Sequence, residues 1–332
     1  MLVLDGRAWP KRSNGVVESW SDGMSAPKTI SPLDAGTSSA VARRRWGSLL
    51  APYLFLLPTV GMLFVFSVVP LVYGMWMSLY DFDVVHGRSA FVALQNYWRL
   101  LHDPQFGLSL LNTVWYTLSV VPLILIGSIA IGVYLRKSTV ARLIARVGFY
   151  VPFVLSPVVV ATSWKWLLNE DLGIMDGLLK WAGLSVIPWL TDDTGARISV
   201  VAATVWNLVG FYMLMVLAGL SQINPDLYEA AKIEGASAWR RFWHITLPLL
   251  APTMLLIVVL ATIHATQAFE TILLLTDGGP AGATRLIIQN MYQSAFTRLQ
   301  PGYGVAQAIT LLPLICLVAW VQMRLFKKAG AL

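Results

Sequence analysis

The sequence predicts an all-α integral membrane protein with six transmembrane helices. Of its 332 residues, 57% are hydrophobic and only 12% are charged, whereas soluble domains carry about 25% charged residues. The apolar residues are grouped in six long runs, each close to the roughly 20 residues that a membrane helix needs. Lys and Arg lie mainly between alternate runs, which is the distribution expected of loops on the inner face of a membrane.

The residues before the first run differ from the rest of the chain. Residues 1–48 are rich in Ser, Gly, Pro and charge, and we expect them to form a disordered cytoplasmic tail. A signal peptide is not expected, because Asp5, Arg7, Lys11 and Arg12 interrupt this stretch and it has no apolar core. Residues 49–328 then form a six-helix transmembrane domain, with spans at about 49–79, 107–135, 147–168, 198–221, 248–275 and 304–326.

The basic residues predict the orientation of the chain. Of 24 Lys and Arg, 17 lie in the tail, in loops 136–146 and 222–247, and at the C-terminal end. The alternate loops 80–106, 169–197 and 276–303 together hold only 6. Both termini and loop 222–247 are therefore expected in the cytoplasm. The net charge of +7 follows from this distribution, and no basic stripe interleaved with aromatic residues indicates nucleic acid.

Motifs for chemistry are missing from the sequence. No Gly-Lys pair is present, so the chain lacks a phosphate-binding loop of its own, and energy from ATP would have to come from a partner. The four histidines are widely spaced and Cys316 is the single cysteine, so no metal site is expected. No Gly-x-Ser-x-Gly nucleophile motif occurs.

Loop 222–247 is predicted to form two short helices joined by a turn. Asn224 is a good N-cap and Pro225 suits the first position of a helix. Gly235 allows a left-handed backbone at the end of that helix, and Ser237 is placed to cap the next one. The small residues of the first helix leave a thin face that another protein can approach closely.

Seven residues of this loop follow a fixed pattern: Glu229, Ala230, Ala231, Gly235, Ile245, Leu247 and Pro248. The pattern resembles the signature loop of the membrane subunits of bacterial ABC importers. The resemblance implies that helix 225–234 is a coupling helix, which lies in a groove of a cytoplasmic ATPase. Glu234 departs from the family, which usually has Asp there, but the charge is kept. An ordinary amphipathic linker is the alternative, and seven matches at fixed spacing disfavour it.

The outer loops extend the resemblance over about residues 50–326. The stretches 94–97 with 112–113, 173–184, 189–192 and 276–280 are similar to carbohydrate-importer permeases of the maltose and glycerol-phosphate type. Gly278-Gly279-Pro280 points to the first of the two permeases in such transporters. The fold implied is the ABC type I importer permease bundle.

The resemblance also implies a location and a set of partners. We expect the chain in the lipid bilayer of the bacterial cytoplasmic (inner) membrane. A second permease would complete a heterodimer, an ATP-binding cassette dimer would use ATP and Mg²⁺, and an extracytoplasmic solute-binding protein would deliver substrate. The chain itself would bind no cofactor.

Polar and aromatic residues inside the fourth and fifth spans are candidates for the substrate path, because polar groups in a membrane are costly. His264, Gln267 and Thr271 would share a face of a straight helix, with Glu270 to one side. The candidates are Asn207, Phe211, Tyr212, His264, Gln267 and Glu270. Hydrogen bonding between helices stays an equal alternative for His264 and Gln267, and a structural or gating ion pair is the preferred interpretation for Glu270.

The sequence therefore favours the permease subunit of an ATP-driven importer of a sugar or a sugar-like phosphate ester, and not an enzyme. One alternative is a membrane-embedded enzyme for lipid-linked substrates, with His264 and Glu270 as acid and base. On one straight helix, however, these residues would not face the same point. The other alternative is a secondary transporter, but no inverted repeat is evident. The outer Arg88, Arg99, Arg285 and Arg298 are the residues that would attract a phosphate.

Overall fold

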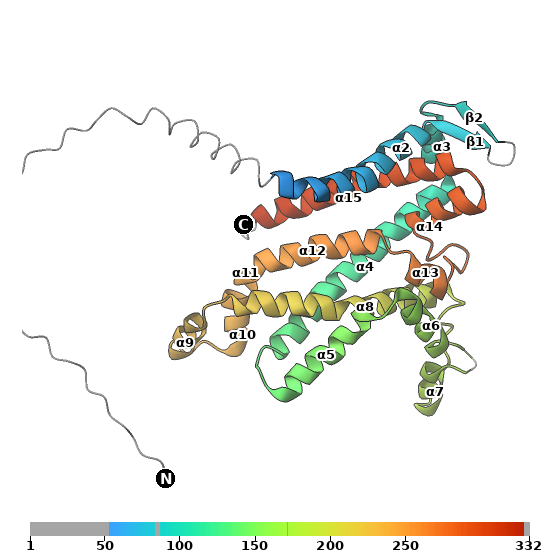
Figure 1. The fold of residues 1–332 in the computed structure, drawn as a ribbon. Helices are drawn as coiled ribbons and strands as arrows, with labels where there is room; N and C mark the ends of the chain where they lie inside the picture. Colours follow the sequence, from blue (N-terminus) through green and yellow to red (C-terminus); the bar gives the residue numbers. More distant parts are fainter. Residues whose placement is uncertain (1–52, 84–86, 171, 329–332) are drawn as a thin grey trace, which may run out of the picture. The chain divides into compact units, whose positions relative to one another are not determined.

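A computed structural model describes residues 53–83, 87–170 and 172–328 (Figure 1). The predicted tail at residues 1–48 lies outside the described residues. The chain divides into two compact units, one that ends at Leu63 and one that begins at Phe64. Every contact discussed below belongs to the second unit.

Four of the described helices are long and apolar enough to cross a membrane singly. They are Tyr53–Met77, which ends in the π-helical turn η1 (Phe64–Val68) and α2 (Val69–Met77), and α4 (Pro104–Tyr134), α8 (Asp193–Ser221) and α15 (Pro301–Lys328). They match the first, second, fourth and sixth predicted spans. Acidic N-caps begin two of them: Asp103 accepts a hydrogen bond from the amide of Gln105, and Asp192 accepts one from that of Thr194.

The third predicted span, 147–168, falls on a bent pair of helices, which counts as one span if the two helices are taken together. The chain forms α5 (Val140–Val154) and α6 (Pro157–Leu167), which meet at an angle of 100°. Leu155 is extended, with φ −68° and ψ 143°, and Ser156 caps α6. Pro157 accounts for the bend, since the ring of a proline disfavours the helical conformation of the residue before it.

The fifth predicted span, 248–275, is also broken. Helix α12 (Ala251–Thr266) ends at the cap residue Gln267, and α13 (Glu270–Leu275) starts after the non-helical Phe269, whose φ and ψ are −134° and −66°. The prediction that His264, Gln267 and Thr271 share one helical face is therefore wrong. No proline or glycine lies at the break. Ile272 and Leu275 of α13 are almost fully buried, so packing of α13 accounts for the turn better than local propensity does.

Two bent helix pairs pass the length and composition test only if their parts are taken together, so the described residues contain four to six candidate spans. The first pair is α5 with α6. The second pair joins α12, at 66°, to the segment that precedes it. That segment consists of α10 (Ala238–Arg241), the π-helical turn η2 (Phe242–Thr246) and α11 (Leu247–Leu249).

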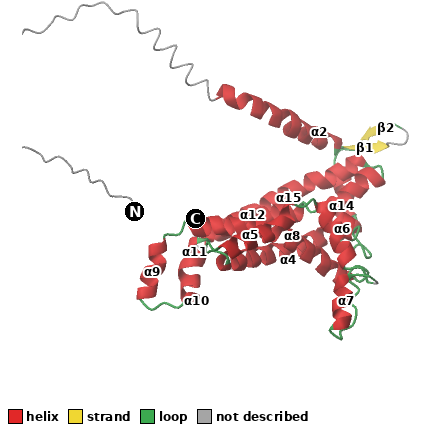
Figure 2. Ribbon diagram, turned by 60° about the horizontal axis from the view of Figure 1, so that its bottom comes forward, coloured by secondary structure: helices red, strands yellow, loops and turns green. Residues whose placement is uncertain are grey.

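The short elements gather at the two ends of the bundle, as both views show (Figures 1 and 2). One end, called the α9 end, carries α9 (Pro225–Ile233) and α10. The other is called the β-hairpin end and holds β1 (Tyr80–Asp83) and β2 (Arg88–Phe91), which pair antiparallel with Tyr80 opposite Phe91. It also holds α3 (Gln95–His102), α6, α7 (Ile174–Trp181), α13, α14 (Ile287–Tyr292) and η3 (Gln293–Thr297).

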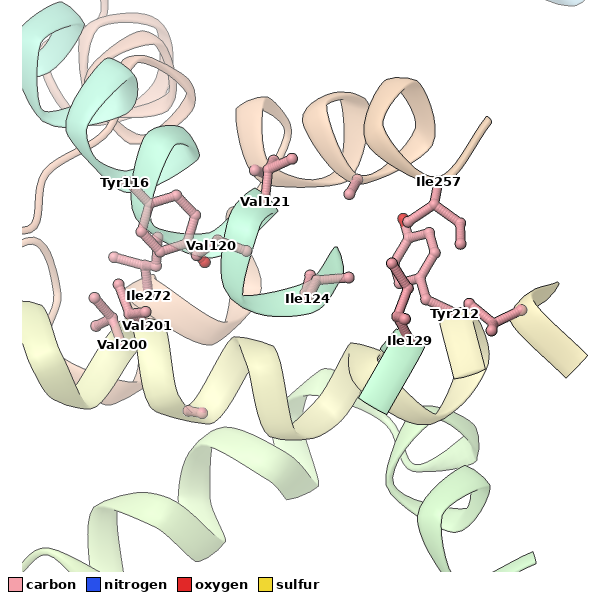
Figure 3. Close-up of a cluster of buried hydrophobic side chains, with 14 of the residues drawn as sticks. Tyr116, Val120, Val121, Ile124, Ile129, Val200, Val201, Tyr212, Ile257 and Ile272 are labelled. Atoms are coloured by element: carbon pink, nitrogen blue, oxygen red, sulfur yellow. The ribbon is translucent and has the colours of Figure 1, made fainter. Parts of the chain in front are cut away.

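The core lies where α4, α8 and α12 meet, and the labelled side chains in Figure 3 come from these helices and from α13. A methyl group added at Gly210 of α8 would lie 1.8 Å from the carbonyl oxygen of Phe149, so the backbones of α5 and α8 touch there. The hydroxyls of Tyr116 and Thr204 are 2.6 Å apart between α4 and α8, so these buried polar groups satisfy each other.

Candidate functional site

The α9–α10 hairpin has the caps that the sequence predicts. The side-chain oxygen of Asn224 accepts a hydrogen bond of 2.9 Å from the amide of Asp226, and Ser237 accepts one of 3.2 Å from that of Arg240. Gly235 has φ +77°. The amides of Gly235 and Ala236 donate to the carbonyls of Lys232 and Ala231, which is the bonding pattern of a glycine-terminated helix. The predicted local structure is confirmed.

The seven pattern residues divide into two groups by exposure. Glu229, Ala230 and Gly235 are exposed on the hairpin, and Ala231 is half-buried. Among the described residues, Glu229 pairs with Lys232, three residues on, at 2.5 Å. The other group lies toward the bundle: Leu247 packs against the main core, Ile245 is half-buried, and Pro248 is exposed. On α9 the pattern residues thus present small side chains and one carboxylate to solvent.

Large apolar side chains also point to solvent on α9. Ile233 is 87% exposed and Leu227 is 46% exposed. Together with the alanines beside them, these side chains form a surface suited to contact with another protein.

One tyrosine that the sequence analysis did not single out attaches α9 to the bundle. The ring of Tyr228 lies under the guanidinium of Arg136, with 4.3 Å between the guanidinium carbon and the ring centroid. Its hydroxyl lies 3.0 Å from that of Thr246. The sequence did contain an indication of this contact: Tyr228 directly precedes the Glu-Ala-Ala triplet, and Arg136 directly follows a predicted span.

The structure brings three of the six substrate-path candidates together. The hydroxyl of Tyr212, on α8, lies 2.8 Å from Nδ1 of His264, on α12. The ring of Phe211 packs edge-on against that of Tyr212, with centroids 5.2 Å apart. On its other side Phe211 stacks on Phe153 of α5 at 4.5 Å. A line of rings therefore joins α5, α8 and α12 and ends at His264.

The remaining candidates lie apart from these rings. Asn207 donates a 2.6 Å hydrogen bond to the carbonyl of Pro152 near the end of α5, so its amide serves the bend between α5 and α6. Gln267 and Glu270 follow His264 along the chain, and all three side chains are exposed. Exposed polar groups next to a span need a polar surrounding, which a water-filled path or a second protein supplies.

Three arginines at the β-hairpin end are bonded within the protein, and the buried Nε of Arg285 has no hydrogen-bond partner among the described residues. Arg99 donates to the side chain of Gln300 at 3.0 Å and covers the ring of Tyr303, and Arg298 donates to the side chain of Gln105. Arg197 donates to the carbonyl of Ala283 at 3.2 Å.

Comparison with known proteins decides the family. The sequence model described as "Binding-protein-dependent transport system inner membrane component" matches residues 123–330. The chain belongs to this family. It is 33% identical over 271 residues to the trehalose/maltose transport system permease protein MalF of Thermococcus litoralis, with 81% of this chain and 90% of that protein covered. It is 32% identical over 286 residues to the sn-glycerol-3-phosphate transport system permease protein UgpA of Agrobacterium fabrum, with 84% and 95% covered.

A solved structure has the same fold. A chain of a bacterial alginate ABC transporter, solved in complex with an alginate pentasaccharide-bound periplasmic protein, superposes with a TM-score of 0.76 at 22% identity. The match covers 88% of this chain and 98% of that one. The chain is thus an ABC importer permease subunit, the ATPase is a separate subunit, and the enzyme and secondary-transporter alternatives are excluded.

Proposed function

We propose that this chain forms, with a second permease, the membrane path of an importer for a neutral sugar, and that a cytoplasmic ATPase dimer drives it through α9. The observation that carries the proposal is the capped hairpin. It matches all seven positions of the family loop, and it exposes Ile233, Leu227 and the small residues around them. ATP and Mg²⁺ belong to the partner, and this chain binds no cofactor.

The hairpin acts as a lever in this proposal. When ATP closes the ATPase dimer, α9 moves with the groove that holds it, and the turn at Gly235 keeps α9 at a fixed angle to α10. The movement shifts the bundle between inward-facing and outward-facing states. ATP shifts that equilibrium only by as much as it prefers the closed groove.

The orientation follows from the charge of the loops. The α9 end faces the cytoplasm of a bacterial cell, and the β-hairpin end faces the solute-binding protein that delivers the substrate. Loops 136–146 and 222–247, which lie at the α9 end, contain 7 Lys and Arg. In this orientation we expect both termini in the cytoplasm.

A neutral sugar suits the site better than a phosphate ester. Arg99 and Arg298, which were candidates for attracting phosphate, are held by Gln300 and Gln105. Near His264 the exposed groups are Gln267 and Glu270, and a carboxylate repels a phosphate. The faces of Phe211 and Tyr212 offer apolar surface for the C–H groups of a sugar ring, while His264 and Gln267 offer hydrogen bonds to hydroxyls.

A pair of matched glycine variants tests the lever. Gly235 and Gly183 have φ of +77° and +73°, and at both positions an added Cβ meets open space. Asp therefore strains the backbone equally at either one, but only Gly235 lies in the hairpin. We expect Gly235→Asp to abolish sugar uptake by the reconstituted importer while its insertion and abundance stay normal, and Gly183→Asp, with the same backbone strain outside the hairpin, to retain uptake well above that of Gly235→Asp. Wild-type uptake by Gly235→Asp at equal abundance would rule out the lever.

The substrate class is tested by competition. We expect an unlabelled neutral disaccharide to inhibit uptake of a labelled one, and glycerol phosphate to have no effect. Glu270→Gln removes the carboxylate and keeps the size of the side chain. If the substrate were a phosphate ester, glycerol phosphate would compete in the wild type and would compete better in this variant.

A further inference from the structure

Helix α9 is attached to the bundle mainly through a single side chain. Tyr228 is the residue of α9 that packs against the main core, and no residue of the helix is buried. We propose that Tyr228 is the positioning residue through which α9 moves the spans, pulling α4 and α5 through Arg136 and α12 through Thr246. This inference rests on the proposed function and names the residues that transmit its movement.

The contact with Arg136 leads to α4 and α5. Arg136 is the second residue after the end of α4, and its guanidinium covers the Tyr228 ring. Arg146 of α5 fixes the same turn: its guanidinium donates to the carbonyl of Leu135 at 2.7 Å and to that of Arg136 at 3.3 Å. These bonds satisfy carbonyls at the C-terminus of α4, where a cation is also favoured by the helix dipole. A pull on Arg136 therefore reaches both helices.

The contact with Thr246 leads to α12. Thr246 is only 5% exposed and closes the π-helical turn η2, directly before α11 and α12. Its hydroxyl is 3.0 Å from that of Tyr228. One tyrosine thus holds two parts of the bundle by two different interactions, a cation over its ring and a hydrogen bond at its tip.

A cleft lined by Arg136 makes the stack a bridge between two parts of the bundle. The cleft has a volume of about 400 Å³, and it is lined by Arg136, Ser138, Arg146, Leu217, Ser221 and Pro225. It separates the α4–α5 loop from the end of α8 and the start of α9. The Arg136–Tyr228 stack joins the α4–α5 loop to α9, so it transmits between them a movement that the open cleft by itself would absorb.

The test compares arginine variants in the purified importer complex in nanodiscs, supplied with its solute-binding protein. Arg136→Gln keeps a polar side chain but removes the guanidinium that covers the Tyr228 ring. Arg142→Gln is the matched control: Arg142 covers the ring of Tyr134 at 5.4 Å in the same α4–α5 region, and its contacts in the described part of the chain do not include α9. The measurement is sugar transported per ATP hydrolysed, at equal content of ATPase subunit.

We expect Arg136→Gln to lower this ratio about tenfold, which lies within the roughly 5- to 150-fold range of typical coupling effects. Tyr228→Leu, which loses both contacts, falls at least as far. Tyr228→Phe keeps the stack and loses the hydrogen bond, so its ratio is intermediate and equals that of Thr246→Val. Arg142→Gln keeps the wild-type ratio. Equal ratios of sugar transported per ATP for Arg136→Gln and Arg142→Gln would overturn the proposal. It would also be overturned if Arg136→Gln lowered the abundance of the protein but left this ratio unchanged.

A second measurement does not depend on the ATPase. In the isolated chain, Arg136→Gln should speed hydrogen exchange of the α9 amides several-fold while exchange in α8 stays unchanged. Unchanged exchange in α9 would mean that the Arg136–Tyr228 stack does not attach α9 to the bundle. Failure of this inference is also distinct from failure of the proposed function. If Gly235→Asp uncouples transport and Arg136→Gln does not, the lever stands and Tyr228 is not its attachment.

Discussion

The two ends of the bundle are held together in different ways. At the α9 end, caps and turns join residues that are close in the chain, such as Asn224 with Asp226 and Ser237 with Arg240. At the β-hairpin end the bonds join distant segments. Asn112 of α4 donates to the carbonyls of Gly282 at 2.8 Å and Arg285 at 3.1 Å, 170 residues or more along the chain.

This difference in bonding indicates the role to which each end is suited. A hairpin fixed by its own caps keeps its shape when it moves, because few of its bonds reach the bundle. An end fixed by bonds between distant segments keeps its shape only while the whole bundle is assembled, since unpaired buried polar groups are costly. The first is suited to a lever, and the second to a firm surface at which a delivered solute enters.

The largest expected effect comes from Asn112→Leu. One buried and one partly buried carbonyl lose their donor, and Arg197 loses the side-chain oxygen that it approaches at 3.4 Å. We expect a loss of about 3 kcal/mol of unfolding free energy, measured as a lower unfolding temperature in detergent, with early proteolysis in loop 276–286. Ser119→Ala on the same helix is the control, because Ser119 bonds only to its own helix, at the Trp115 carbonyl. An unchanged unfolding temperature would mean that these distant bonds do not stabilise this end.

A smaller and strictly local effect is expected from Asn224→Ala. Loss of the cap bond to Asp226 costs about 1 kcal/mol of helix stability. Because α9 is bonded mainly to itself, faster hydrogen exchange should be confined to the first turn of α9, and the unfolding temperature of the bundle should not move. Asn224→Asp retains a capping oxygen and should exchange as the wild type does. If Asn224→Ala lowered the unfolding temperature as much as Asn112→Leu, the contrast between the two ends would be wrong.

The same contrast explains what the sequence could predict. Asn224, Gly235 and Ser237 specify the hairpin through neighbours in the chain, and the prediction of its caps is confirmed. The bend between α5 and α6 also had a local signal, since Ser156-Pro157 is a helix start inside an apolar run. The break at Phe269 had none, because it depends on the burial of Ile272 and Leu275 by segments far away in the chain.

The candidate site divides in the same way. The sequence named Tyr212 for its aromatic ring and His264 for its polar group inside a span, but only the packing of α8 against α12 shows that they bond to each other. Asn207 was chosen because an amide suits a hydroxyl, and its amide instead bonds the Pro152 carbonyl, whose position no pattern specified. Tyr228 lies just outside the family pattern, and its role depends on Arg136 from another loop.

The smallest expected effect sharpens the comparison at the α9 end. Lys232 and Glu229 form an ion pair whose side chains are 51% and 64% exposed, and such a pair contributes about 0.3 kcal/mol or less because water and salt screen it. Lys232→Gln should therefore leave hydrogen exchange of α9 nearly unchanged in the isolated chain. If the same variant lowers sugar transport in the complex, the lost contact must lie outside this chain, since the helix itself does not depend on the pair. Faster exchange throughout α9 would instead show that the ion pair, and not only the caps, maintains the helix.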